Sequence, residues 1–187
     1  MTAQSLRSIY QIKVTLQHIQ PQVWRRFRVV STTNLADLHI ALQIIMGWSN
    51  SHLHQFVKGD CCYGIPDEEF PDNTLDEKNF RLDQLLKAEM DCLNYSYDFG
   101  DGWEHQVMLE KVLSFDQKTS STHCLEGEWS CPPEDVGGPP GYVMFLEAIS
   151  DASHPEHKEM LEWAGGEFDM EFFDLKVVNE ALEKQFR

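Results

Sequence analysis

Two histidines separated by one residue are the first candidates for chemistry in this sequence. His52 and His54 fall in a segment, residues 52–58, that we predict to be a strand. Alternate side chains of a strand point to the same face, so both imidazoles would be within reach of one metal ion. Imidazole nitrogens suit zinc or a similar transition metal. The alternative is that both rings are structural polar contacts near Phe56.

Residues 92–113 have the clearest hairpin pattern, and their apolar side chains predict its register. A three-residue loop over 100–102 pairs Phe99 with Trp103 and places the apolar side chains of both strands on one face. Gly102 then takes the left-handed position that such loops favour. The predicted apolar face consists of Leu93, Tyr95, Tyr97, Phe99, Trp103, His105, Val107 and Leu109.

The same register gathers carboxylates on the opposite face of the hairpin. Asp98 would lie opposite Glu104, with Asp101 at the tip of the loop. Like charges directly opposed on neighbouring strands destabilise a sheet by up to about 1 kcal/mol. Solvent, an arginine such as Arg26 or Arg28, or a bound metal ion would each relieve this repulsion. The sequence leaves these three alternatives open.

A second pair of carboxylates is held in a segment rich in proline and glycine. Glu134 and Asp135 lie within residues 132–141, which we expect to be neither helix nor interior strand, because prolines lack an N–H and glycines lack a side chain to pack. Such a loop can present carboxylates to a ligand or a metal ion. The alternative is a chain reversal whose acidic side chain caps a helix or pairs with Arg25. His105, on the apolar face, is either a hydrogen-bonded core residue or a base.

The elements expected around these residues are strands in the first half of the chain and helices in the last third. They are a hairpin over 9–30, a helix that Thr33 or Asn34 caps and Gly47 ends, strands over 52–58 and 61–65, an acidic loop over 66–80, a short helix at 82–86, the 92–113 hairpin, and helices over 142–150, 155–164 and 175–184. This order favours α+β over alternating α/β. We expect a single domain over residues 1–187, with a mostly antiparallel N-terminal sheet, one packed helix and a helical C-terminal third.

The composition excludes several classes of protein. The 187 residues include 31 acidic and 15 basic side chains, a formal net charge of −16, so direct binding to nucleic acid is not expected. No apolar run approaches the roughly 18 residues of a membrane span, and the first residues lack the order of a signal peptide. The five cysteines show no repeated C-x-x-C spacing, which favours the reducing cytoplasm.

Several motifs, taken together, resemble one known family. They are the segment 10–26, the segment 35–48 ending in Met-Gly-Trp, His52 to Phe56, Tyr97 to His105, and Pro132 to Tyr142. In this order they resemble the plasmid pRiA4b ORF-three-like family over nearly the whole chain. The resemblance implies a compact α+β domain without an established activity, and some relatives are described as passengers of mobile elements. The resemblance implies no catalytic role for any single residue. The positions that match the family motifs are His52, His54, Asp98, Asp101, His105, Cys124, Glu134 and Asp135.

Two functions agree with these residues. The first is a binding or adaptor domain for a basic protein partner, docked on an acidic surface with exposed aromatic side chains such as Trp48, Trp103 and Trp129. The alternative is a metal-dependent hydrolase with a divalent ion, zinc or manganese, whose bound water is the nucleophile. Its ligands would be His52, His54 and one or more of Asp98, Asp101, Glu104 and Asp135, with Glu134 or His105 as base. This alternative requires the histidines and carboxylates to converge in one cleft.

Overall fold

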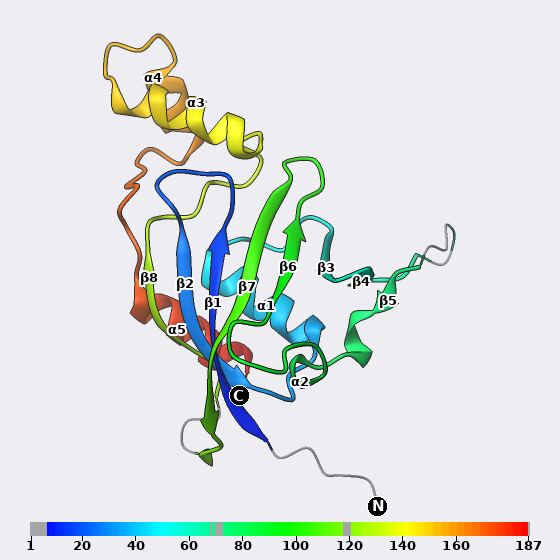
Figure 1. Ribbon diagram of the computed structural model, residues 1–187. Helices are drawn as coiled ribbons and strands as arrows, with labels where there is room; N and C mark the ends of the chain where they lie inside the picture. Colours follow the sequence, from blue (N-terminus) through cyan, green and yellow to red (C-terminus); the bar gives the residue numbers. More distant parts are fainter. Residues whose placement is uncertain (1–6, 68, 70–72, 118–120, 187) are drawn as a thin grey trace, which may run out of the picture.

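The centre of the fold is one sheet, which the computed structural model describes together with its helices over residues 7–67, 69, 73–117 and 121–186. In these ranges eight strands pair in the order β5-β4-β3-β6-β7-β1-β2-β8 (Figure 1). The strands are β1 (Ser8–Leu16), β2 (Trp24–Val30), β3 (His54–Lys58), β4 (Cys61–Gly64), β5 (Leu75–Asp76), β6 (Cys92–Tyr97), β7 (Trp103–Ser114) and β8 (His123–Glu128). Only the short β4–β5 pair at one edge is parallel, so the expected mostly antiparallel sheet is confirmed.

The helices divide into two groups. They are α1 (Leu35–Met46), the one-turn α2 (Leu82–Leu85), α3 (Gly138–Ser150), α4 (His157–Trp163) and α5 (Leu175–Gln185), with a 3-10 turn η1 (Glu77–Asn79). α1 and α5 touch each other and lie behind the sheet, whereas α3 and α4 pack together beyond one end of it (Figure 1). Within the described ranges, no helix combines the length and the apolar character that crossing a bilayer requires.

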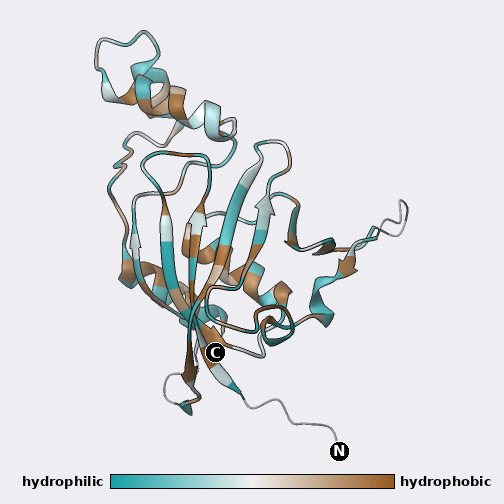
Figure 2. Ribbon diagram, viewed as in Figure 1, coloured by the Kyte–Doolittle hydropathy of each residue, from teal (hydrophilic) through white to brown (hydrophobic). Residues whose placement is uncertain are grey.

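The first hairpin and α1 form as the sequence predicts. β1 and β2 pair antiparallel with Ile12 opposite Phe27, and their alternate apolar side chains are buried. The side chain of Asn34 accepts a hydrogen bond from the N–H of Asp37, and Gly47 ends α1 in the left-handed conformation. Hydrophobic segments therefore meet between the middle of the sheet and α1 (Figure 2).

The register of the β6–β7 hairpin differs from the prediction by two residues. Tyr97, not Phe99, pairs with Trp103, so the connection has five residues, 98–102, and Phe99 is 55% exposed. Ser96 lies opposite Glu104 and donates a hydrogen bond to its carboxylate, so the predicted Asp98–Glu104 repulsion does not arise. A shift of two residues leaves every side chain on the same face, so apolar alternation could not distinguish the two registers.

The start of α3 corrects a second prediction. The helix begins at Gly138, inside the segment expected to be a loop, and contains Pro139 and Pro140 in its first turn. The N–H groups of a first turn have no intrahelical acceptor, so proline loses no hydrogen bond there. The expected acidic loop over 66–80 lies partly outside the described residues, and its second half forms β5 and η1.

β8, which the sequence analysis did not predict, pairs with β2 at the edge of the sheet. Asn179 of α5 covers part of this edge, because its amide donates to the carbonyl of Cys124 and accepts from the N–H of Cys124. Arg25 lies beneath the end of β8, 2% exposed, and donates to the carbonyls of Glu128 and Trp129. This buried guanidinium therefore joins the end of β8 to β2.

The surface tryptophans expected for partner binding are mostly not on the surface. Trp48 and Trp103 are 8% and 1% exposed, and Trp129 is half-buried. Trp48 stacks on Tyr97 with ring centroids 5.0 Å apart, and its indole N–H donates to the carbonyl of Pro132. These aromatic rings serve the packing at the end of the sheet, so a docking surface has to be sought elsewhere.

Candidate functional site

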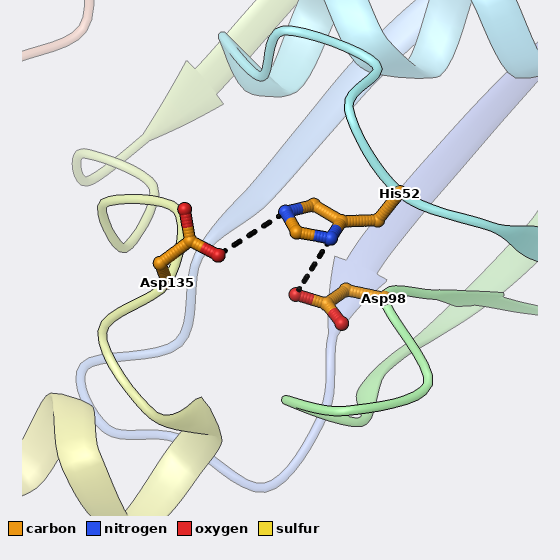
Figure 3. Close-up of side chains that lie close together, drawn as sticks. All are labelled: His52, Asp98 and Asp135. Carbon is orange, nitrogen blue, oxygen red and sulfur yellow. Dashed lines mark ion pairs between the residues drawn. The ribbon is translucent and has the colours of Figure 1, made fainter.

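Three chain segments meet at the end of the sheet where β6 joins β7. They are the α1–β3 loop (47–53), the β6–β7 turn (98–102) and the segment before α3 (132–137). The imidazole of His52 lies between two carboxylates, with Nδ1 3.6 Å from Asp98 Oδ2 and Nε2 3.3 Å from Asp135 Oδ1 (Figure 3). One possible ligand atom from each residue lies within 4.8 Å of the other two. These three residues form the candidate site.

His52 is held by hydrogen bonds on both sides of it in the chain. The N–H of Ser51 donates to the Tyr97 hydroxyl at 3.0 Å, and the carbonyl of Leu53 accepts from the N–H of Asp98 at 2.9 Å. The His52 ring stands edge-on to the Tyr97 ring, with centroids 5.7 Å apart. The loop therefore presents this imidazole at a fixed position beside the β6–β7 turn.

Asp98 is buried at the start of the turn and has one oxygen directed at His52. Its backbone is in the left-handed conformation, which aspartate tolerates better than most residues. Its Oδ1 accepts from the N–H groups of Gly100 and Asp101 at 3.0 and 3.3 Å, as in an Asx turn. Oδ2 remains for His52 or for an ion.

Asp135 comes from the third segment and is positioned by the turn that carries Asp98. The carboxylate of Asp101 accepts from the N–H of Gly137 at 3.1 Å. Gly138 packs so closely on this turn that a Cβ there would lie 2.2 Å from the Asp101 carbonyl oxygen. The Asp135 side chain itself is 71% exposed, so one wall of the site is open to solvent and adjustable.

Glu134 fastens the same segment to the α1–β3 loop. Its carboxylate accepts from the N–H and hydroxyl of Ser49 at 2.9 and 2.5 Å, and from the Tyr97 hydroxyl at 2.5 Å. Burial alone would raise the pKa of Glu134, but these hydrogen bonds outweigh it and hold the pKa below its usual value. Three hydrogen bonds stabilise the ionised form and tie the carboxylate to two other segments, so this geometry favours a positioning role over that of a base.

His54, expected beside His52, lies in a separate buried cluster. Its ring stacks on His39 with centroids 3.4 Å apart, and its Nε2 is 2.9 Å from the equally buried Glu77 carboxylate. The strand begins only at His54, so His52 is in the loop and the alternation that would have aligned the two rings does not apply. The structure therefore does not bring the two histidines to one ion.

His105 lies in the core, beneath Trp48, at 1% exposure. Its Nδ1 is 3.1 Å from the carbonyl oxygen of Tyr95, and burial lowers its pKa to about 4, so the ring is neutral at neutral pH. A base must reach the proton that it takes, and a ring that is almost fully buried in the core does not reach a substrate at the surface. The structure therefore supports the core interpretation of His105.

Two contributors to the site were not found by the sequence analysis. Tyr97 was assigned to the apolar face, yet its hydroxyl joins Ser51 to Glu134 and burial raises its pKa. Ser49 binds Glu134 through both its backbone and its hydroxyl. No spacing in the sequence signals either contact, since 85 residues separate Ser49 from Glu134 and 37 separate Tyr97 from it.

The chemistry of the three-residue cluster suits a divalent cation. One imidazole and two carboxylates are a donor set that zinc or manganese accepts, and the exposed side of Asp135 leaves room for further ligands. His52 Nε2 is buried, and its approach to Asp135 lacks hydrogen-bond geometry, so it has no hydrogen-bond partner among the described residues. The competing arrangement has no ion, and His52 contacts both carboxylates directly.

Comparison with known proteins finds a similar sequence and a solved structure with the same fold. The family model described as "Plasmid pRiA4b ORF-3-like protein" matches residues 8–177. Uncharacterized protein y4hQ of Sinorhizobium fredii is 42% identical over 181 residues, which cover 94% of this chain and 91% of that protein. A crystal structure of a protein of unknown function, MM3350 from Methanosarcina mazei Go1, matches with a TM-score of 0.82 and 34% identity over 92% of this chain and 98% of its own. The chain belongs to the plasmid pRiA4b ORF-3-like family.

Proposed function

We propose that this protein binds one divalent metal ion, zinc or manganese, through His52, Asp98 and Asp135, and that the bound ion supports hydrolysis. The observation that carries the proposal is the convergence of one ligand atom from each residue within 4.8 Å, although the residues come from three distant segments. The Nε2 atom of His52 is buried, lies 3.3 Å from Asp135 Oδ1 and has no hydrogen-bond partner among the described residues, so it is available to an ion beside Asp135.

The spacing of the three ligand atoms is wider than that around a bound ion and can be compared with it. Ligand atoms about 2.0–2.2 Å from a tetrahedral zinc ion lie roughly 3.3–3.6 Å from each other, so the three atoms would have to move closer together when an ion binds. Asp98 is fixed by its turn, whereas the 71% exposed Asp135 side chain is free to rotate toward an ion. Three protein ligands and an open side are typical of catalytic rather than structural zinc sites.

The neighbouring residues would maintain this geometry during a reaction. An ion held here would lower the pKa of a coordinated water molecule and so supply a nucleophile near neutral pH. Asp98 anchors one side, while Glu134 and Tyr97 keep the loop carrying His52 against the segment carrying Asp135. Acyl and phosphoryl esters are the substrates to test, and the exposed side of Asp135 is the open approach to the site.

The test is metal binding by isothermal titration calorimetry with Zn²⁺ and Mn²⁺ after chelator treatment, followed by hydrolysis of bis(4-nitrophenyl) phosphate and 4-nitrophenyl acetate. We expect one ion per chain, and loss of binding and turnover in His52→Ala and Asp98→Asn. Asp60→Asn, in the exposed β3–β4 turn, removes the same charge outside the site and serves as the matched control. Wild-type protein that binds neither ion would refute the site, and binding without turnover would refute the hydrolytic step alone.

A second candidate function is docking of a basic protein partner. The formal charge of −16 favours it, and so do the apolar side chains exposed on the α3–α4 pair, among them Met144 at 65% and Trp163 at 48% exposure. Pull-down with immobilised protein at low and at raised salt tests this function, because electrostatic docking weakens as salt increases. Capture of no basic protein at low salt would count against it.

A further inference from the structure

A pocket of about 300 Å³ lies between α3 and α4, next to the candidate metal site. Its apolar part includes Met144, Phe145, Met160 and Trp163, and its carboxylates are Asp135, Glu156 and Glu159. Hydrophobic and hydrophilic stretches alternate along this helix pair (Figure 2). The pocket therefore combines apolar walls with an acidic lining.

The apolar part of the pocket consists of side chains that pack against one another. Phe145 is 1% exposed and makes edge-to-face contacts with Trp163 and Phe168, with centroids 6.0 and 5.1 Å apart. Trp163 remains 48% exposed and Met144 65% exposed, so both have surface available to a ligand. An occupant with an apolar stem would cover these side chains and remove them from water.

The charge of the pocket has one sign. Three carboxylates line it, and no basic side chain is among its described lining residues. The basic side chain on α4, Lys158, lies 3.5 Å from Glu162 instead, and the Nδ1 of His157 is 3.0 Å from the carbonyl oxygen of Ala148. Neither of these groups neutralises Glu156 or Glu159, so a cation is the complementary occupant.

We propose that this pocket binds the long cationic side chain of an arginine or lysine in a flexible segment of a basic protein partner. The inference rests on the second candidate function and assigns it a location. The aliphatic stem would pack on Met144 and Met160 while the charged end reaches the carboxylates. The exposed face of Trp163 offers a cation–π contact, which an arginine uses best. A neutral apolar side chain could pack on the methionines but could not pair with the carboxylates. An anion would be repelled by the carboxylates.

The test measures binding of a fluorescein-labelled peptide, in which arginines alternate with glycine and serine, to the full-length protein by fluorescence anisotropy. A peptide of equal length with citrulline in place of arginine keeps the shape of the side chain and removes its charge. We expect the arginine peptide to bind about tenfold more tightly than the citrulline peptide at low salt. The Glu156→Gln/Glu159→Gln variant should weaken arginine-peptide binding about fivefold, and Trp163→Ala should weaken it as well.

The matched control separates the pocket from the general negative field of the protein. Asp60→Asn/Glu183→Gln removes the same two charges from exposed positions outside the pocket and should leave the affinity within about twofold of the wild type. Equal weakening in both double variants would overturn the pocket as the docking site but leave partner binding in place. Failure of the wild-type protein to bind the arginine peptide at low salt would overturn both the pocket as the docking site and the binding of a basic partner.

Discussion

The Asp101 carboxylate accepts a hydrogen bond from the backbone N–H of Gly137 at 3.1 Å, across 36 residues of sequence. Asp101 belongs to the β6–β7 turn, and Gly137 is two residues beyond Asp135. This contact therefore fixes the distance between the turn that carries Asp98 and the segment that carries Asp135. The Asp101 carboxylate therefore keeps Asp98 and Asp135 close together without itself having to bind the ion.

Removal of this contact should weaken metal binding more than it weakens the fold. We expect Asp101→Ala to lower the affinity for Zn²⁺ at least about tenfold, as loss of a residue that orients ligands usually does. One partly exposed hydrogen bond contributes only about 1 kcal/mol to the free energy of unfolding. Calorimetric titration and urea denaturation measure the two effects separately. Asp101→Asn, which keeps an acceptor oxygen, should retain most of the affinity, and equal affinities in all three proteins would contradict the positioning role.

Substitution of Glu134 should reveal a contribution to stability that depends on pH. Its folded-state pKa is below the ordinary value of 4.5, so the contribution is present above pH 4.5 and is lost as pH falls through the folded-state pKa. We expect Glu134→Gln to lower the free energy of unfolding at pH 7 by about 1–2 kcal/mol, since three donors lose a charged acceptor. Denaturation curves should show this difference shrinking below pH 4.5. A difference that stays constant down to pH 3 would show that the charge is not involved.

The buried histidines should make the protein less stable in mild acid. Burial lowers the pKa of both His39 and His105 from 6.5 to about 4, so between these values the unfolded chain binds more protons than the folded one. Stability is then fully present above pH 6.5 and falls toward pH 4, by up to about 1.4 kcal/mol per pH unit for each histidine. We expect His105→Phe, which cannot titrate, to have a shallower dependence in urea denaturation between pH 4.5 and 7. An unchanged slope would be evidence against a neutral buried His105.

Arg25 should contribute strongly to stability, although its hydrogen bonds to the described residues go to carbonyl oxygens and a thiol rather than to a carboxylate. Its guanidinium donates to the carbonyls of Ile45, Glu128 and Trp129, which lie at the ends of α1 and β8. Lysine keeps the charge but lacks the planar set of five donors. We therefore expect Arg25→Lys to lower the free energy of unfolding by about 2–4 kcal/mol. The surface substitution Arg81→Lys should cost less than about 1 kcal/mol, and similar losses in both variants would contradict the assignment.

The position of Asp135 predicts that the two proposed ligands compete. This carboxylate belongs both to the metal cluster and to the lining of the α3–α4 pocket. An ion that engages it would reduce the negative charge available to an arginine side chain, and by linkage the arginine peptide would weaken the ion equally. We expect saturating Zn²⁺ to lower peptide affinity a few-fold in the anisotropy assay. The effect should vanish in His52→Ala, and its persistence there would place the ion elsewhere.

Local patterns were sufficient to predict most strands and helices, but not the connections that carry the site residues. Alternation gave the β1–β2 hairpin, and capping residues gave the limits of α1 at Asn34 and Gly47. β8 was missed because His123 to Glu128 shows no alternation of apolar and polar residues, and its strand conformation depends on pairing with β2. The start of α3 was missed because prolines in a first turn resemble prolines in a loop.

The sequence by itself determined the chemical types available, a histidine and carboxylates on turns and loops, and the α+β order of the elements. Only the tertiary structure decided which of them meet. It joined His52 to Asp98 and Asp135, and it separated His54, which pairs with Glu77 in the interior. The physical reason is that periodicity fixes only the face on which a side chain lies. Which loops lie together at the end of a sheet depends on long-range contacts, such as that between Asp101 and Gly137, that leave no periodic trace in the chain.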